Sequence, residues 1–578
     1  MTRPVIDPIL VAVIGNRLDT ITKEIGQTML RTSRSPIFSE ARDFVTGIFD
    51  NQNRLVAQTA YIPVLAGCLP YTVKAIYEHF KGDIHEGDVY VVNDPYSGNN
   101  HPPDITIAIP VFWQGKFEFW SISKGHHADI GGGGVAGYAP GCTSIFEECI
   151  RIVPSRLYSK GVYQTDMWNM ILKNVFLTHI VEGDLNCQVG ACRIGERGLK
   201  TILEKYGSET LYAAMDEIFD ASEKHMRSEI AKIPKGKYYA ERFVDHDGVN
   251  TDKMIKLAVE VTVNDDSMIF DLSASDKQVP GYVNSPIANT VSSCYLAILT
   301  TVDSDFAFNE GALRPLTVIA PSGSVVNCEF PAPTTCATIA TANPIIETVW
   351  LALSQAVPQK VQASWSRWSA PASMGFNPNT GRTFADIHFL CKSGAGATYG
   401  FDGWSHLGSI VTCGGLRTPD PELHELSSPY TLLDFEYLVD SGGPGKWRGG
   451  WGTLVRWRVD APGIRSANFG GGCREATAAY GLMGGKPAPK NILQVIRGSE
   501  IIPVDAESLL NLEVGDIYEV YESGGGGFGN PLERPAEKVA KDVHDGLVSF
   551  KSAKEDYGVV VDPLTFEVDT VATSKLRA

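Results

Sequence analysis

The sequence concentrates metal-ligand side chains between Ser39 and Ile130, in the segments SEARDF, NNHPPD and GHHADI. The candidate ligands are Glu40, Asp43, His101, Asp104 and His126, and His127 is a further catalytic candidate. Mixed nitrogen and oxygen ligands of this kind suit zinc, manganese or iron. A bound metal lowers the pKa of water toward about 7, which generates hydroxide for attack on a carbonyl carbon. The competing interpretation is that His101 caps a turn and the later histidines are ordinary loop residues.

A predicted hairpin explains how these residues would meet. The runs DITIAIPVFW (104–113) and KFEFWSISK (116–124) are typical of strands, and Gln114-Gly115 separates them as a turn. Asp104 opens the first strand and His126 follows the second, so both lie at the same end of the hairpin. Two prolines between His101 and Asp104 restrict how those side chains are aimed. Adjacent His126 and His127 point to opposite sides of an extended chain, so we expect one to ligate and the other to support it or carry a proton.

The surrounding pattern predicts an α+β fold. Apolar residues at helical spacing predict a long opening helix over 10–29 that packs on a sheet. The segment 87–94 adds a strand to the hairpin, which makes the first part a mixed α/β unit. Helices are predicted over 183–232, with Gly207 as a stop and Ser208 as the N-cap of the next helix.

The length of 578 residues predicts more than one structural unit. We expect an N-terminal α+β domain with the metal site at 1–234 and a β-rich middle domain at 235–390, where apolar residues alternate strictly. A third region, 391–578, combines glycine-rich loops with short β runs. It ends with a helix predicted over 534–556 that docks on the body.

Composition excludes several classes of function. The net charge is −17 and no long Lys/Arg cluster occurs, which argues against a nucleic-acid partner. No apolar run reaches the length of a membrane span, and Asp7 and Arg17 interrupt the opening run too early for a signal peptide. Eleven scattered cysteines without a C-x-x-C pair favour a reducing compartment, so we expect a cytoplasmic protein.

Two glycine-rich segments, GGGVAG (132–137) and GGGGFG (524–529), match G-x-G-x-x-G but lack the strand–turn–helix context of a nucleotide site. Gly131 to Gly134 would either wrap an anion or act as a hinge. The phosphate-loop pattern G-x-x-x-x-G-K-[ST] is absent, and so is the serine-hydrolase pattern G-x-S-x-G. The sequence therefore predicts no nucleotide site in this chain.

Five segments together resemble the hydantoinase B / oxoprolinase family, and the resemblance runs through nearly the whole chain. They are SEARDFVTGIFD, VVNDPYSGNNHPPDITIAIPVF, GHHADIGG, EGDLNCQVGACRIGERGL and the end from GGGGFGNPLERPAEKVAKDVHDGLVS to DYGVVV. One departure is local. Many relatives carry G-G-T-H-L-P-D where this chain has Gly98-Asn99-Asn100-His101-Pro102-Pro103-Asp104, so the ligand types are kept while their neighbours differ.

The resemblance implies a division of labour with a hydantoinase A-type partner, in a heterotetramer of two A-type and two B-type subunits. The partner would bind ATP and Mg and phosphorylate the substrate, and this chain would complete the reaction at a divalent metal, zinc in the first place. The family's ligands map onto Glu40 or Asp43, then His101, Asp104 and His126. Bicarbonate is a further cofactor to consider.

The expected function is ATP-dependent opening of a lactam or hydantoin ring by hydroxide generated at the metal. The alternative within the enzymes is a component of a ketone carboxylase of the acetone or acetophenone type. A third interpretation, a purely structural scaffold for the A-type partner, leaves the cluster of ligand-type residues unexplained.

Overall fold

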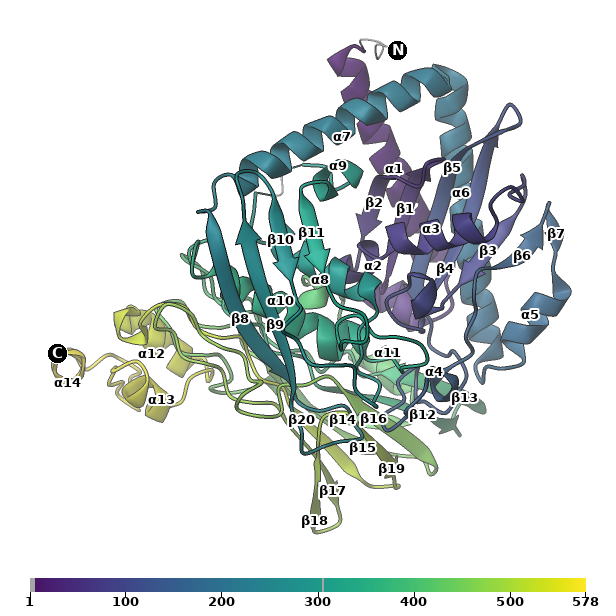
Figure 1. The fold of residues 1–578 in the computed structure, drawn as a ribbon. Coiled ribbons are helices and arrows are strands. Elements are labelled where there is room, and N and C mark those ends of the chain that lie inside the picture. Colours follow the sequence, from purple (N-terminus) through teal and green to yellow (C-terminus); the bar gives the residue numbers. More distant parts are fainter. Residues whose placement is uncertain (1–5, 304–305) are drawn as a thin grey trace.

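The computed structural model describes residues 6–303 and 306–578, and it shows four β-sheets with helices between and around them (Figure 1). The mixed helix and strand content agrees with the predicted α+β class. The helices outside the C-terminal end are α1 (Pro8–Thr32), α2 (Pro63–Ala66), α3 (Leu69–His79), α4 (Ile145–Glu148), α5 (Thr165–Leu172), α6 (Thr178–Tyr206), α7 (Ser208–Ile230), α8 (Ile287–Leu299), α9 (Glu310–Leu313), α10 (Ala342–Leu353) and α11 (Pro421–Ser427).

The first sheet carries the predicted hairpin. In spatial order its strands are β2 (Leu55–Ala60), β1 (Phe44–Asp50), β5 (Lys116–His126), β4 (Asp104–Trp113), β3 (Val89–Val92), β6 (Ser155–Ser159) and β7 (Val162–Tyr163). Strands β4 and β5 pair with Asp104 directly opposite His126. Gln114 and Gly115 both have positive φ, 50° and 77°, as a two-residue hairpin turn requires. The prediction that Asp104 and His126 share one end of the hairpin is confirmed.

Helices α1 and α6 lie against each other, and α6 also packs on β4 and β5. The predicted apolar stripe of α1 is buried from Ile14 to Met29. Gly195 and Gly198 allow the close approach, because a Cβ at Gly195 would lie 2.2 Å from Ser121 Oγ and one at Gly198 would lie 2.9 Å from Ile21 Cγ1.

The break between α6 and α7 falls at Gly207, as predicted, but the N-cap prediction is wrong. Gly207 itself is the N-cap residue and Ser208 is the first residue of α7. The Ser208 hydroxyl donates to Glu118 of β5 instead of capping the helix.

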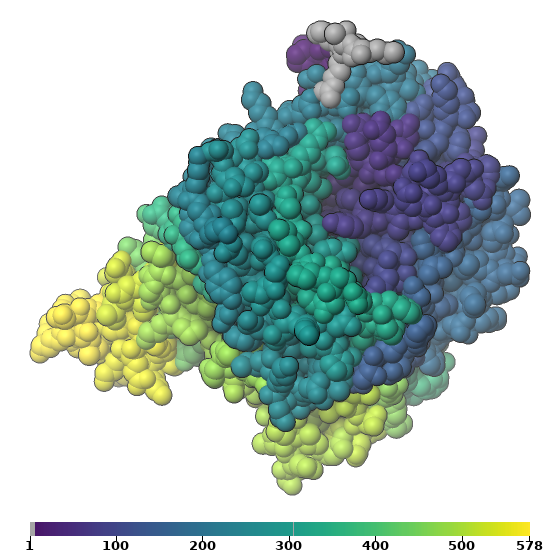
Figure 2. All heavy atoms as spheres, in the orientation of Figure 1, coloured from purple at the N-terminus to yellow at the C-terminus, as the bar shows by residue number. Residues whose placement is uncertain are grey.

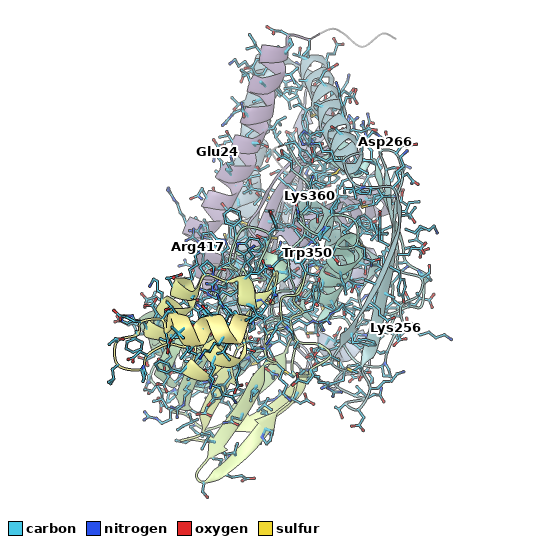
Figure 3. All side chains as sticks on the ribbon, turned by 90° about the vertical axis from the view of Figure 1, so that its left-hand side faces the viewer. Glu24, Lys256, Asp266, Trp350, Lys360 and Arg417 are labelled. Carbon is cyan, nitrogen blue, oxygen red and sulfur yellow. The ribbon has the colours of Figure 1, made fainter. Side chains whose placement is uncertain are left out.

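Three further sheets follow the long helices. In spatial order, the second sheet contains β11 (Leu316–Ile319), β10 (Met268–Asp271), β9 (Ile255–Val263) and β8 (Gly236–Val244). The third contains β13 (Arg382–Ile387), β12 (Ala370–Asn377), β16 (Ile464–Phe469) and β19 (Ser508–Leu512). The fourth contains β14 (Tyr430–Tyr437), β15 (Thr453–Val459), β20 (Ile517–Tyr521), β17 (Ile492–Arg497) and β18 (Glu500–Val504). Helix α10 packs on α8, β8 and β9. Its Trp350 lies in the interior and donates to the carbonyl of Ala297 (Figure 3).

The C-terminal region is helical but differs from the single helix predicted over 534–556. Two helices, α12 (Ala536–His544) and α13 (Phe550–Glu555), flank Gly546, whose positive φ of 74° ends the first. A third helix, α14 (Thr570–Arg577), follows. This lobe projects from the body (Figure 2) and docks on it through a separate apolar cluster that includes Trp451.

The glycine run 524–527 has a packing role. A Cβ at any of these four positions would come within 2.2 Å of a backbone atom of a neighbouring loop. Such contacts explain why the segment needs glycine without invoking a nucleotide.

One apolar cluster contains buried side chains from Ile14 through Phe528 and therefore joins all four sheets. The division into 1–234, 235–390 and 391–578 stays a prediction. Among the residues that the structure describes, no helix is both long and apolar enough to cross a membrane.

Candidate metal centre

Three of the predicted ligands converge at the end of the β4–β5 hairpin. His101 Nε2 lies 3.1 Å from Asp104 Oδ1, and His126 Nδ1 lies 3.5 Å from the same oxygen. One ligand atom from each residue falls within 4.8 Å of the other two, and all three side chains are buried. Two imidazoles and one carboxylate at these separations match the ligand set of a divalent metal.

The hydrogen bond that orients the His101 ring is consistent with a metal at this cluster. Its Nδ1 lies 2.8 Å from the carbonyl oxygen of Thr335, and since a carbonyl only accepts, Nδ1 carries the proton in this contact. The other ring nitrogen, Nε2, then faces the Asp104 carboxylate oxygen. Asp104 Oδ1 and His126 Nε2 have no hydrogen-bond partner among the described residues. A cation between the two rings and the carboxylate would satisfy the buried Asp104 oxygen.

The loop before β4 is held by its two asparagines. The Asn99 side-chain amide donates to the carbonyls of Asn93, His101 and Asp104, so it fixes the loop backbone. Asn100 donates from Nδ2 to Asp104 Oδ2, which leaves Oδ1 for the histidines. The local departure from the family pattern therefore contributes a direct contact to a ligand.

The two upstream carboxylates go to different places. They flank the end of the π-helical turn Ile37–Ala41, after which Arg42 adopts a positive φ of 64° and reverses the chain. Asp43 lies beside the centre: its carbonyl accepts from His126 N, and burial together with the charge of Asp104 raises the pKa of its carboxyl to about 7, against the opposing effect of His126. Glu40 instead faces Asp386, Asp420 and His424.

His127 points away from the three converging side chains. Its Nε2 lies 2.9 Å from Gln188 Oε1 on α6, and its ring meets Phe38 edge-on at 5.4 Å. Burial lowers the pKa of His127, which favours the neutral ring. The neighbouring Asp129 accepts from the backbone of Gly131 and Leu177 and so ties this loop to the start of α6.

Some residues of the centre could not be found by pattern. Thr335 orients His101 from a segment far along the chain, and Glu148 holds that segment by accepting from the Thr334 and Thr335 amides. Tyr138 forms an aromatic wall, with its ring 5.9 Å from His126 and stacked at 3.8 Å on Phe469. The sequence offered one signal, the glycine-rich stretch that precedes Tyr138, and none for Thr335 or Glu148.

Comparisons with known proteins agree with the resemblance. The family model for hydantoinase B/oxoprolinase matches residues 7–531. The chain is 34% identical to the caprolactamase beta subunit of Pseudomonas jessenii, with 99% of each chain covered. It is 30% identical to the B-type component of a putative D-/L-hydantoinase of Pseudomonas sp. (strain NS671), with 99% of this chain and 98% of the relative covered.

Solved structures show the same fold. The ATP-dependent caprolactamase of Pseudomonas jessenii superposes with a TM-score of 0.92 at 33% identity, covering 99% of this chain and 100% of that one. A nucleotide-free acetone carboxylase also gives a TM-score of 0.92, at 22% identity, over 99% of this chain and 82% of its own. With a family model that spans most of its length and relatives aligned end to end, the chain belongs to the hydantoinase B/oxoprolinase family.

Proposed function

We propose that this chain is the B-type component of an ATP-dependent hydrolase of cyclic amides, active together with an A-type partner that binds ATP. The observation that carries the proposal is the buried His101–Asp104–His126 cluster, in which a nitrogen of each ring lies within 3.5 Å of Asp104 Oδ1 and that oxygen has no hydrogen-bond partner among the described residues. Relatives named as the beta subunit of a caprolactamase and the B-type component of a hydantoinase support the substrate class and the need for a partner.

Each residue has a distinct part in this proposal. His101, Asp104 and His126 would hold a divalent metal, zinc in the first place, and Asp43 is the upstream carboxylate that lies beside them. The metal, when bound, would supply a nucleophilic water at neutral pH. Thr335 fixes the proton on His101, and Asn100 orients Asp104. Burial of the cluster excludes bulk water from the activated substrate.

The test is ring opening by this chain reconstituted with an A-type partner, ATP and a panel of lactams and hydantoins. We expect an amino-acid product, and ATP consumption coupled to it. His101→Ala, Asp104→Ala and His126→Ala should each abolish the product and remove the metal of this centre, while the exposed His544→Ala serves as the matched control. The chain alone should hydrolyse no ATP, and turnover by the purified chain would contradict the division of labour.

His127→Ala separates ligation from support. Because His127 contacts Gln188 and not the cluster, we expect metal content to persist and the rate to fall much less than in the three ligand variants. A carboxylase of the acetone type is the alternative function, and product analysis distinguishes it, since a ketone substrate would gain a carboxylate and no ring would open. Active, metal-free protein would refute both.

A further inference from the structure

A second group of metal-ligand side chains lies between the third and fourth sheets. Asp386 lies near the end of β13, His388 follows that strand, and His424 lies on α11. One ligand atom from each falls within 4.8 Å of the other two, and His424 Nδ1 lies 3.1 Å from Asp386 Oδ2. Ligand atoms of a tetrahedral ion with bonds of about 2.0–2.2 Å are about 3.3 Å apart, so small side-chain rotations suffice to close this set on one ion.

The histidine ring farthest from solvent is already oriented. His388 Nε2 lies 2.9 Å from Ser373 Oγ, and the ring stacks on Trp457 at a centroid distance of 4.4 Å. This leaves Nδ1 as the ligand atom. A second ring nitrogen held by a hydrogen bond is the usual arrangement of metal-binding histidines. His424 meets the His388 ring edge-on at 5.2 Å, which brings the two imidazoles to the same point.

One side of the cluster opens into a cavity. The cavity has a volume of about 310 Å³ and is lined by Asp386 and His424 but not by His388. Glu40 lies on its wall together with apolar residues that include Phe389 and Leu423. Glu40 thus adds one further carboxylate on the open side of the cluster.

We propose that Asp386, His388 and His424 form a second site for a divalent transition metal, separate from the centre at the hairpin. Its fourth coordination position faces the cavity, where Glu40 is the nearest additional carboxylate to complete the shell or to orient a bound ligand. Three protein ligands with one open position is the arrangement of a reactive metal site and not of a closed structural one.

The test is the zinc content of the full-length chain, stripped by chelator, reloaded with zinc chloride and desalted. Asp386→Asn and, separately, His424→Gln should each lose about one zinc per chain, both in the wild-type background and in His101→Ala. Glu422→Gln on the exposed face of α11 is the matched control and should lose none. Cobalt loading adds a second readout, since each loss should remove one set of visible d–d bands.

The outcomes separate the two sites. Zinc that falls with His101→Ala but not with Asp386→Asn or His424→Gln overturns the second site and leaves the proposed function intact. Zinc that falls with Asp386→Asn but not with His101→Ala supports the second site and overturns the first. Thermal unfolding of each variant identifies loss of fold, and the conservative Asp386→Asn keeps the side-chain volume so that folding and ligation are not confounded.

Discussion

At the scale of single residues, some partners that orient the candidate metal ligands lie close to them in the sequence and others lie far away. The meeting of Asp104 and His126 was predictable, because a two-residue turn fixes the register between them. The His101 contact with Thr335 spans 234 residues and was not, since no local pattern encodes it. The sequence likewise leaves open which of Glu40 and Asp43 would ligate, and the reversal at Arg42 that separates their surroundings has no sequence signal.

Glu148 supports His101 through the segment it holds. Glu148→Ala leaves the buried Thr334 and Thr335 amides without an acceptor, which costs roughly 1–3 kcal/mol each in unfolding free energy. We expect lower stability by denaturant unfolding and metal affinity weakened about 10–100-fold, because the Thr335 carbonyl loses its position. The exposed neighbour Glu147→Ala is the control. Unchanged metal affinity in Glu148→Ala would show that His101 is oriented without Thr335.

Lys392 provides a test by pH. Burial, with a smaller effect of Arg417, lowers the pKa of its ammonium to about 7, and its Nζ donates to the carbonyl of Leu416. In the unfolded chain the lysine pKa is about 10.4, so between about pH 7 and pH 10 the unfolded chain binds more protons than the folded one. The unfolding free energy therefore rises with pH across this window. Lys392→Met should therefore stabilise the protein at pH 7, by at most roughly 4 kcal/mol at about 1.4 kcal/mol per pKa unit, and the gain should shrink toward about pH 10. A pH-independent difference between the two proteins would be inconsistent with this titration.

At the scale of elements, periodicity predicted the helices and strands better than it predicted their contacts. The stripe of α1 and the hairpin appear where the pattern placed them. The capping prediction for Ser208 failed because its hydroxyl finds a tertiary partner in Glu118. The glycines of α6 gave no signal of their role, because close approach is visible only once the neighbouring helix is in place.

Two glycines of α6 make a matched pair. Gly195→Ala forces a Cβ against Ser121 and Ile25, so we expect a loss of about 1–3 kcal/mol in unfolding free energy from overpacking. Gly190→Ala has nothing within 4 Å and should gain roughly 0.5–1 kcal/mol from helix propensity. Thermal melts of the two variants are the measurement, and equal shifts in the same direction would contradict the close-packing account.

At the scale of the whole molecule, the C-terminal lobe is attached through a buried cation. Arg534 is 2% exposed and pairs with Asp402 and Asp542, which join the lobe to the body. Arg534→Met leaves both carboxylates without this partner, at a cost of about 3 kcal/mol. We expect faster limited proteolysis between 530 and 578, whereas Lys541→Met, on the exposed face of α12, should leave cleavage unchanged. If the two variants are cleaved at the same rate, the apolar cluster around Trp451 alone holds the lobe on the body.

The long separation between His101 and Thr335 also bears on biosynthesis. A ribosome adds about 5–20 residues per second, so the hairpin emerges roughly 10–50 s before the carbonyl that orients its histidine exists. During that interval His101 can rotate freely, and the nascent chain has no finished pocket with which to select its metal. For the metal centre proposed above, loading is therefore expected only after the segment that contains Thr335 has been made.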